Sequence, residues 1–282
     1  MRLLEWFWEY VAHLRLFWQI PLKLCLLILF ILLVLFPNPT LLLKQLSVYG
    51  NVDSLIQTDF DGIDQINQEI TAVLPNNVTR EQEFTAVQRY VYEHIAYAYD
   101  WENWLNIDYW PTAAEVWNQK QEDCDGQAVL AASILRSRGF SSAKLAGNMR
   151  HIWVAVDRDA LMGPESEQTI RREDGKVRIT LPSWELLLGS FAIGLADFQE
   201  FRSLLIYFGV LLTCYHPCCA RSRFFGVTTL GLVGFIFLKD WADQVMTTYK
   251  VTTNMSFWGG VIFLLSSIIL SLGMQKILKH RP

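Results

Sequence analysis

Several motifs that mark common classes of protein are missing from this chain of 282 residues. It contains no Gly-rich phosphate-binding loop, no pair of histidines at metal-ligand spacing and no internal repeat. These absences argue against a P-loop nucleotide-binding protein and against a solenoid or propeller. We therefore expect a protein that uses no cofactor and no metal ion.

Cysteine is also scarce, and its placement excludes a disulfide scaffold. Of five cysteines, only Cys124 lies between residues 41 and 185, where a secreted scaffold would carry pairs. Cys25 lies in an apolar run. The remaining three surround His216 at the end of another run: Cys214, Cys218 and Cys219. No second ligand group completes a tetrahedral metal shell there, so we interpret these thiols as packed at a helix end.

Positive charge is low in the same segment. Residues 41–185 carry 13 Lys and Arg against 22 Asp and Glu, a net charge of −9, whereas the rest of the chain carries 11 against 6. Phosphate binding needs a basic face, so this acidic segment excludes nucleic acid as a partner.

Long apolar runs, by contrast, are present. They cover residues 20–36, 201–219, 224–238 and 257–274, each near the roughly 20 residues that cross a bilayer core. The first run has no small-residue cleavage site after it, which favours an uncleaved anchor over a signal peptide. Residues 1–18 and 186–195 are expected to form helices at the membrane interface. The chain is thus predicted to cross the membrane four times and to contact lipid.

Basic residues in the short loops predict the orientation of these spans. Arg221 and Arg223 lie between the second and third runs, and Lys276, Lys279 and Arg281 lie in the tail, both without acids. The loop expected at 239–250 carries both positive and negative charges. By the positive-inside rule, both termini face the cytoplasm of a cell (inner) membrane and residues 41–185 face out. Three regions follow: an anchor at 1–40, an outer domain at 41–185 and a membrane region at 186–282.

Helix and strand signals in the outer domain lead to one conspicuous pair of residues. Helices are expected at 63–73, at 80–95 with Thr79 as the cap, and at 112–117. Cys124 then opens a helical pattern that Asp123 can cap, and Gly139 ends it. His151 opens a strand-like run, HIWVAV, 27 residues after Cys124. A thiol at a helix N-terminus is expected to have a lowered pKa, and an imidazole held opposite can act as its base.

These residues resemble those of the transglutaminase-like superfamily of papain-type cysteine enzymes. The resemblance rests on Asp123, Cys124, the turn from Arg136 to Gly139, and His151 with Trp153, Val154 and Val156. It covers roughly residues 84–165, and Glu122 stands where the family usually has Gly. It implies an α+β domain, in which the helix carrying Cys124 packs on an antiparallel sheet, with Cys124 as nucleophile and His151 as base.

The sequence leaves open which residue is the third catalytic group, the one that orients His151. The superfamily orients its His with an Asp in a D-P pair, and Gly163-Pro164 stands in something like that place. A hairpin centred on Arg158 would put Glu165 opposite His151, so Glu165 is our candidate, with Asp157, Asp159 or no acid as alternatives. A second hairpin is expected to turn at Asp174-Gly175.

The remaining candidate site residues are two aromatic residues upstream of Cys124 and one further histidine. The family often places an oxyanion-stabilising side chain upstream of its Cys, and Trp110 and Tyr109 are candidates for that binding role. His94, on the helix expected at 80–95, is the other histidine of the outer domain and is more typical of a packed or surface residue than of a catalyst.

Two classes of function are compatible with the sequence. The first is a membrane-anchored cysteine peptidase, amidase or transamidase that acts on protein or peptide at the cell envelope. The second is an inactive scaffold that keeps the fold, binds peptide or glycan and assists assembly of a cell-envelope system with another membrane protein.

The predicted topology can be tested directly with reporter fusions. A reporter fused after Leu181 and one fused at the C-terminus should lie on opposite sides of the membrane, because the basic loops hold the tail in the cytoplasm. The measurement is paired alkaline phosphatase and green fluorescent protein activity. Equal signals from the two positions would contradict this arrangement.

Overall fold

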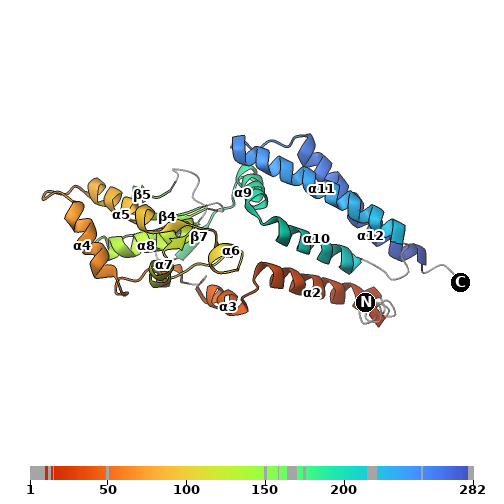
Figure 1. Cartoon of the computed structure of the whole chain (residues 1–282), viewed down its shortest axis with the longest axis horizontal. Helices are drawn as coiled ribbons and strands as arrows, with labels where there is room; N and C mark the ends of the chain where they lie inside the picture. The colour runs from red at the N-terminus through yellow and green to blue at the C-terminus, as the bar shows by residue number, and fades with distance from the viewer. Residues whose placement is uncertain are drawn as a thin grey trace. The chain divides into compact units, whose positions relative to one another are not determined.

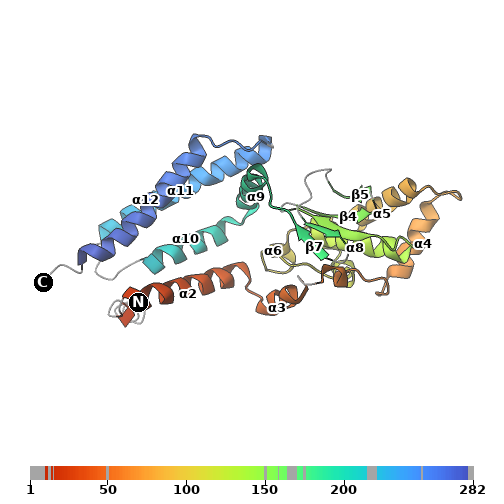
Figure 2. The same ribbon diagram turned by 180° about the vertical axis from the view of Figure 1, so that it is seen from behind.

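The computed structural model describes residues 10–11, 14, 16–48, 51–148, 151–157, 159–163, 170–173, 176–214, 221–248 and 250–278. The chain divides into two compact units, one formed by Met1–Leu35 with Ser183–Pro282 and the other by Phe36–Pro182. The sequence predicts these boundaries at residues 40 and 185, within a few residues of the observed ones at Leu35 and Pro182. Figures 1 and 2 show the elements of both units from opposite sides.

Short, well-capped helices make up the first part of the second unit. They are α3 (Pro39–Val48), the 3-10 helix η1 (Val52–Leu55), α4 (Ile63–Val73), α5 (Arg80–His94), α6 (Asp100–Asn103), α7 (Ala113–Gln119) and α8 (Cys124–Ser137). Thr79 and Thr112 each form a capping box, at the start of α5 and of α7. The N-terminal signals read from the sequence therefore start these helices as expected.

Two sheets complete this unit. β1 (Ala96–Tyr97) and β2 (Gln121–Glu122) form a parallel pair. The larger sheet has the order β5-β4-β3-β6-β7 with antiparallel neighbours, from β3 (Lys144–Gly147), β4 (Ile152–Val156), β5 (Asp159–Leu161), β6 (Ile170–Glu173) and β7 (Lys176–Ile179). The unit is thus α+β, and the hairpin expected around 174–175 is confirmed by the pairing of Glu173 with Lys176.

Helix α8 is the centre of this unit. Every residue from Asp125 to Leu135 is buried, including three alanines whose small side chains allow close approach. The helix packs against β3 and β4 on one side and against α5 and α7 on others, as the two views show (Figures 1 and 2). Gly139, with φ of 97°, ends it in the left-handed conformation that glycine adopts at low cost.

The hairpin of β4 and β5 has a different register from the one expected. Val156 pairs with Asp159 and Val154 with Leu161, so the turn is centred between Asp157 and Arg158 rather than on Arg158. Asp157, with φ of 55°, makes this two-residue turn possible. A shift of one residue places each side chain on the opposite face of the strand. Glu165, which the expected register puts opposite His151, lies outside the described residues.

The other unit is helical. It contains α2 (Leu16–Leu35), α9 (Trp184–Asp197), α10 (Glu200–Cys214), α11 (Arg221–Thr248) and α12 (Met255–Leu278). Within it, α11 packs along α12 and α2 along α10 (Figures 1 and 2). Two stretches of the described chain are long and apolar enough to cross a membrane, Phe17–Leu35 and Phe225–Thr248, and Met255–Leu270 is a shorter apolar stretch.

One detail of this unit corrects the expectation from sequence. The expected loop at 239–250 is helical as far as Thr248, since no Gly or Pro interrupts it and Trp241 and Ala242 are fully buried. The helix expected to lie at the interface, α9, packs against α11, and the Lys239 ammonium donates to the carbonyls of Ala196 and Phe198 at its end. Cys214 ends α10, while Cys218 and Cys219 lie outside the described residues.

Candidate active site

Cys124 is the first residue of α8, and its thiol is half-buried beside the start of β4. The Asp123 side chain caps the helix by accepting from the backbone N–H of Asp125 at 3.1 Å. The backbone N–H of Ile152, the residue that follows His151, is near enough to the thiol to lower its pKa. Helix α8 packs against β4, so Cys124 at the start of α8 and His151 just before β4 belong to elements that are in contact (Figure 1).

The His151 ring is held in one orientation by a backbone carbonyl. Its Nε2 lies 2.6 Å from the oxygen of Met162. Because a carbonyl can only accept, Nε2 carries a proton, and in the neutral form of the ring the lone pair lies on Nδ1. The His151 backbone is fixed as well, since its N–H donates to the Asn148 side chain and its carbonyl accepts from the Asn148 N–H. This neutral tautomer is the one that a general base requires.

A close contact explains why Met162 reaches the ring. Met162 has a φ of 61°, and Gly163 lies so near Trp153 that a Cβ on Gly163 would come within 2.4 Å of the indole. Trp153 itself lies under the His151 ring, with centroids 6.3 Å apart. Trp153 of the H-x-W motif thus supports both the histidine and the chain segment that orients it.

Glu165, the acid expected to orient His151, lies outside the described residues and stays a candidate. Asp157 and Asp159 instead form ion pairs with Arg80, at 2.8 Å and 3.1 Å. Asp157 and Asp159 therefore stabilise the β4–β5 turn, and in the described part of the chain the Met162 carbonyl takes the orienting position.

Four carboxylates lie close together at the start of α8. Asp123 and Asp125 flank Cys124, Glu122 precedes them in β2, and Asp100 arrives from α6. Glu122 is fully buried, and its two oxygens accept from the Trp104 indole N–H at 2.5 Å and from the Asp123 N–H at 3.0 Å. Gly126 provides the room for Glu122, because a Cβ there would lie 2.5 Å from the Glu122 Cγ. Glu122, at the position where the family has Gly, is therefore built into the packing.

The carboxylates change the protonation chemistry of the site. Burial and then the charge of Asp123 raise the pKa of Asp100 to about 9, and burial raises the pKa of Glu122 to about 8. Burial first, and then Asp123, also raise the pKa of the Cys124 thiol to about 12. The backbone N–H groups of Ile152 and Cys124 act in the other direction. The expected lowering of this pKa by the helix end is therefore wrong, because burial and negative charge outweigh it.

The aromatic candidates have structural contacts of their own. Tyr109 is fully buried, its hydroxyl lies 3.1 Å from the Glu115 carboxylate, and its backbone N–H donates to Asp100 at 2.8 Å. Trp110 is half-buried against the core. Tyr109 therefore positions Asp100 through its backbone, and its hydroxyl is occupied by Glu115.

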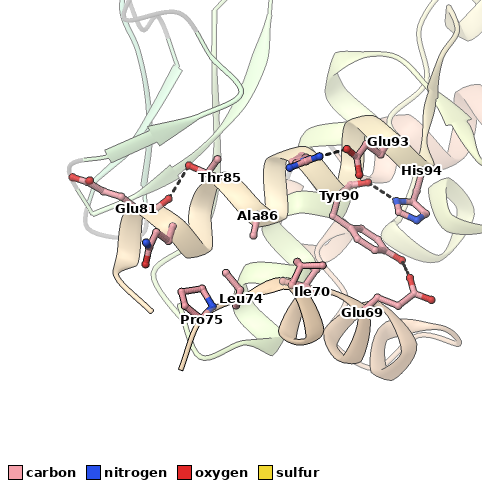
Figure 3. A pocket seen from close by; sticks show the side chains of 13 residues that line it. Glu69, Ile70, Leu74, Pro75, Glu81, Thr85, Ala86, Tyr90, Glu93 and His94 are labelled. Atoms are coloured by element: carbon pink, nitrogen blue, oxygen red, sulfur yellow. Dashed lines mark hydrogen bonds and ion pairs between the residues drawn. The ribbon is translucent and has the colours of Figure 1, made fainter. Parts of the chain in front are cut away.

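His94 lies in a separate groove between α4 and α5, of about 680 Å³ (Figure 3). Its ring stacks on Tyr90 at 3.9 Å, and its Nδ1 lies 2.9 Å from the Tyr90 carbonyl. The Tyr90 hydroxyl donates to Glu69 across the groove at 2.5 Å. His94 is thus packed against its own helix, as expected for a histidine of that pattern.

Comparison with protein-family models, with curated proteins and with solved structures finds no match for this chain. Function has to follow from the side chains themselves. Sequence reasoning missed Asp100, Trp104 and Met162 as parts of the site. The run EDCD around Cys124 was a visible signal for an acidic cluster, but Asp100 joins it only through the β1–β2 pairing.

The raised thiol pKa predicts slow alkylation in metal-free buffer. A pKa of about 12 leaves the Cys124 thiolate roughly a thousandfold scarcer at pH 7 than that of a free thiol near pKa 8.5. Iodoacetamide should modify Cys124 correspondingly more slowly than it modifies glutathione, and the rate should still rise above pH 9. Asp123→Asn keeps the helix cap and removes the charge, so it should speed the reaction. Site-resolved mass spectrometry gives these rates, and a rate that levels off below pH 9 would contradict the assignment.

Proposed function

We propose that this protein is a membrane-anchored cysteine enzyme of transglutaminase-like type that transfers acyl groups from amide substrates outside the cytoplasm. The observation that carries the proposal is the packing of α8, which begins at Cys124, against β4, which directly follows a His151 ring whose Nε2 is held by the Met162 carbonyl. A nucleophile, a base and an orienting acceptor are the parts that such chemistry needs.

The reaction follows from these three groups. The Cys124 proton passes to Nδ1 of His151 while sulfur attacks the substrate carbonyl carbon. The resulting imidazolium gives the proton to the leaving amine, the C–N bond breaks, and a thioester remains on Cys124. Water or a second amine then attacks the thioester, with His151 as base, and the thiol is released. Water gives hydrolysis, and an amine gives transamidation.

Membrane attachment is part of the same proposal. The two apolar stretches Phe17–Leu35 and Phe225–Thr248 support anchoring in a membrane. We include α10 and α12 as further spans, which makes four and leaves both termini on the cytoplasmic side. In this arrangement the unit from Phe36 to Pro182 faces the cell envelope, where protein or peptide is the available substrate.

A specific observation favours the alternative, an inactive scaffold that binds peptide or glycan. The Cys124 thiol has a raised pKa, and Asp123 and Asp100 contribute to the rise. A scaffold needs no thiolate, whereas an enzyme must form one during the reaction. The two candidates therefore differ in whether His151 changes the reactivity of Cys124.

Labelling with a peptidyl acyloxymethyl ketone separates the two functions. In the purified full chain, His151→Gln should lower the labelling rate of Cys124 by about a hundredfold or more, since a positioned base contributes on that scale. His94→Gln is the matched control and should label within about twofold of the wild type, and Cys124→Ser should not label at that position. Equal labelling of wild type and His151→Gln would favour the scaffold.

A further inference from the structure

The groove between α4 and α5 is separate from the candidate active site. In the described part of the chain its lining comes from within residues 69–75 and 81–94, and α8 and β4 contribute nothing to it (Figure 3). Its volume of about 680 Å³ falls in the range of ligand pockets, about 300–1,000 Å³. The groove is therefore large enough to take several side chains of a partner.

The middle of the groove is apolar and fixed in place. Ile70 and Tyr90 are buried, and Leu74 and Ala86 are half-buried against the core (Figure 3). The hydrogen bond from the Tyr90 hydroxyl to Glu69 joins α5 to α4 across the groove. A surface that is already held in one arrangement loses little conformational freedom when a ligand binds.

Carboxylates stand at both ends of this apolar middle. Glu81 lies at one end, and Glu69 and Glu93 lie at the other (Figure 3). The guanidinium among the lining residues, Arg89, donates to Glu93 at 2.7 Å. Three carboxylates against one guanidinium leave the lining with a net charge of −2.

Two of these carboxylates are open to a cationic partner. The Tyr90 hydroxyl first, and the Gln65 amide second, lower the pKa of Glu69, so Glu69 is charged at neutral pH. Glu81 is exposed, and among the described residues its carboxylate makes no hydrogen bond or ion pair. Glu93 is engaged by Arg89. One available negative charge thus stands at each end of the groove.

The distance between the two ends indicates the length of a ligand. Glu81 and Glu93 lie on the same helix, α5, and the 12 residues between these positions span about 18 Å at about 1.5 Å per residue. An extended peptide advances about 3.3 Å per residue, so about five or six residues cover the same length.

We propose that this groove binds an extended peptide segment of a partner protein, with a basic side chain at each end and an apolar side chain between them. The basic groups pair with Glu81 and Glu69 in charge-assisted hydrogen bonds, and the apolar side chain packs on Ile70 and Ala86. The surplus of acids over residues 41–185 attracts such a segment and repels an acidic one.

Fluorescence anisotropy with a labelled six-residue peptide tests the site on the full chain in detergent. The probe has lysine at both ends, leucine at the third position and alanine elsewhere. It should bind at low salt and weaken as sodium chloride rises from about 50 to about 300 mM, because salt screens exposed charges. The same peptide with glycine for leucine should bind at least fivefold more weakly, and a peptide with glutamate at both ends should not bind.

Substitutions on the surface of the groove locate the charges that matter. Glu81→Lys should weaken binding at least tenfold, and Glu69→Gln, which can still accept from Tyr90, at least threefold. Asp59→Lys reverses an exposed acid outside the groove and should bind within about twofold of the wild type. Thermal unfolding checks that each variant is folded.

A photo-crosslinking peptide, with benzoylphenylalanine in place of leucine, gives the position directly. Digestion and mass spectrometry should find the crosslink within residues 69–94. The proposal is overturned if the peptide does not bind, if it crosslinks elsewhere, or if Glu81→Lys and Asp59→Lys have equal effects. Spermine that binds as tightly as the peptide, with no loss for the glycine peptide, would also overturn it, since the groove would then recognise charge alone.

The groove does not depend on the acyl-transfer proposal, and the two can fail separately. Cys124→Ser and His151→Gln should bind the peptide as tightly as the wild type does. Labelling of Cys124 that ignores His151, with normal peptide binding, would refute the enzyme alone. Absence of peptide binding with normal labelling would refute the groove alone.

Discussion

The contact between the start of α8 and the start of β4 is the constraint on which the rest of this domain depends. Helix α8 is buried along its length, so its position is fixed by the core on every side. Its first residue, Cys124, is therefore fixed too, and the backbone N–H of Ile152 is near enough to the thiol to lower its pKa. Because His151 precedes Ile152, the strand that packs on α8 also carries the imidazole. The same packing stabilises the fold and brings together the elements that carry Cys124 and His151.

Local signals predicted much of this arrangement from sequence. The helix caps at Thr79, Thr112 and Asp123 are local, and each starts a helix where expected. The elements that carry Cys124 and His151 were also predictable, since a helix start and a strand start are both visible in the pattern. The register of the turn at Asp157 was not, because either register of a short hairpin fits the alternation of its residues.

Contacts between segments that are distant in the sequence could not be predicted from local sequence patterns. Asp100 joins Glu122 because β1 pairs with β2, and each of these strands is only two residues long. Met162 orients His151 through a carbonyl, a group that every residue carries. Likewise, the helix that continues to Thr248 is stabilised by the burial of Trp241, which depends on packing within the helical unit.

The negative charge around Cys124 opposes the reactivity of its thiol. A nucleophilic thiol needs its negative form, yet burial and the neighbouring carboxylates disfavour that form.

The most direct test of the central claim is to trap the acyl-enzyme. The full chain is mixed with an activated peptide ester, quenched in acid and digested, and the mass of the Cys124 peptide is measured. The enzyme account predicts an added acyl group on Cys124 that hydroxylamine removes and that His151→Gln forms at least tenfold more slowly. No acyl group on Cys124, or equal acylation with and without His151, would contradict it.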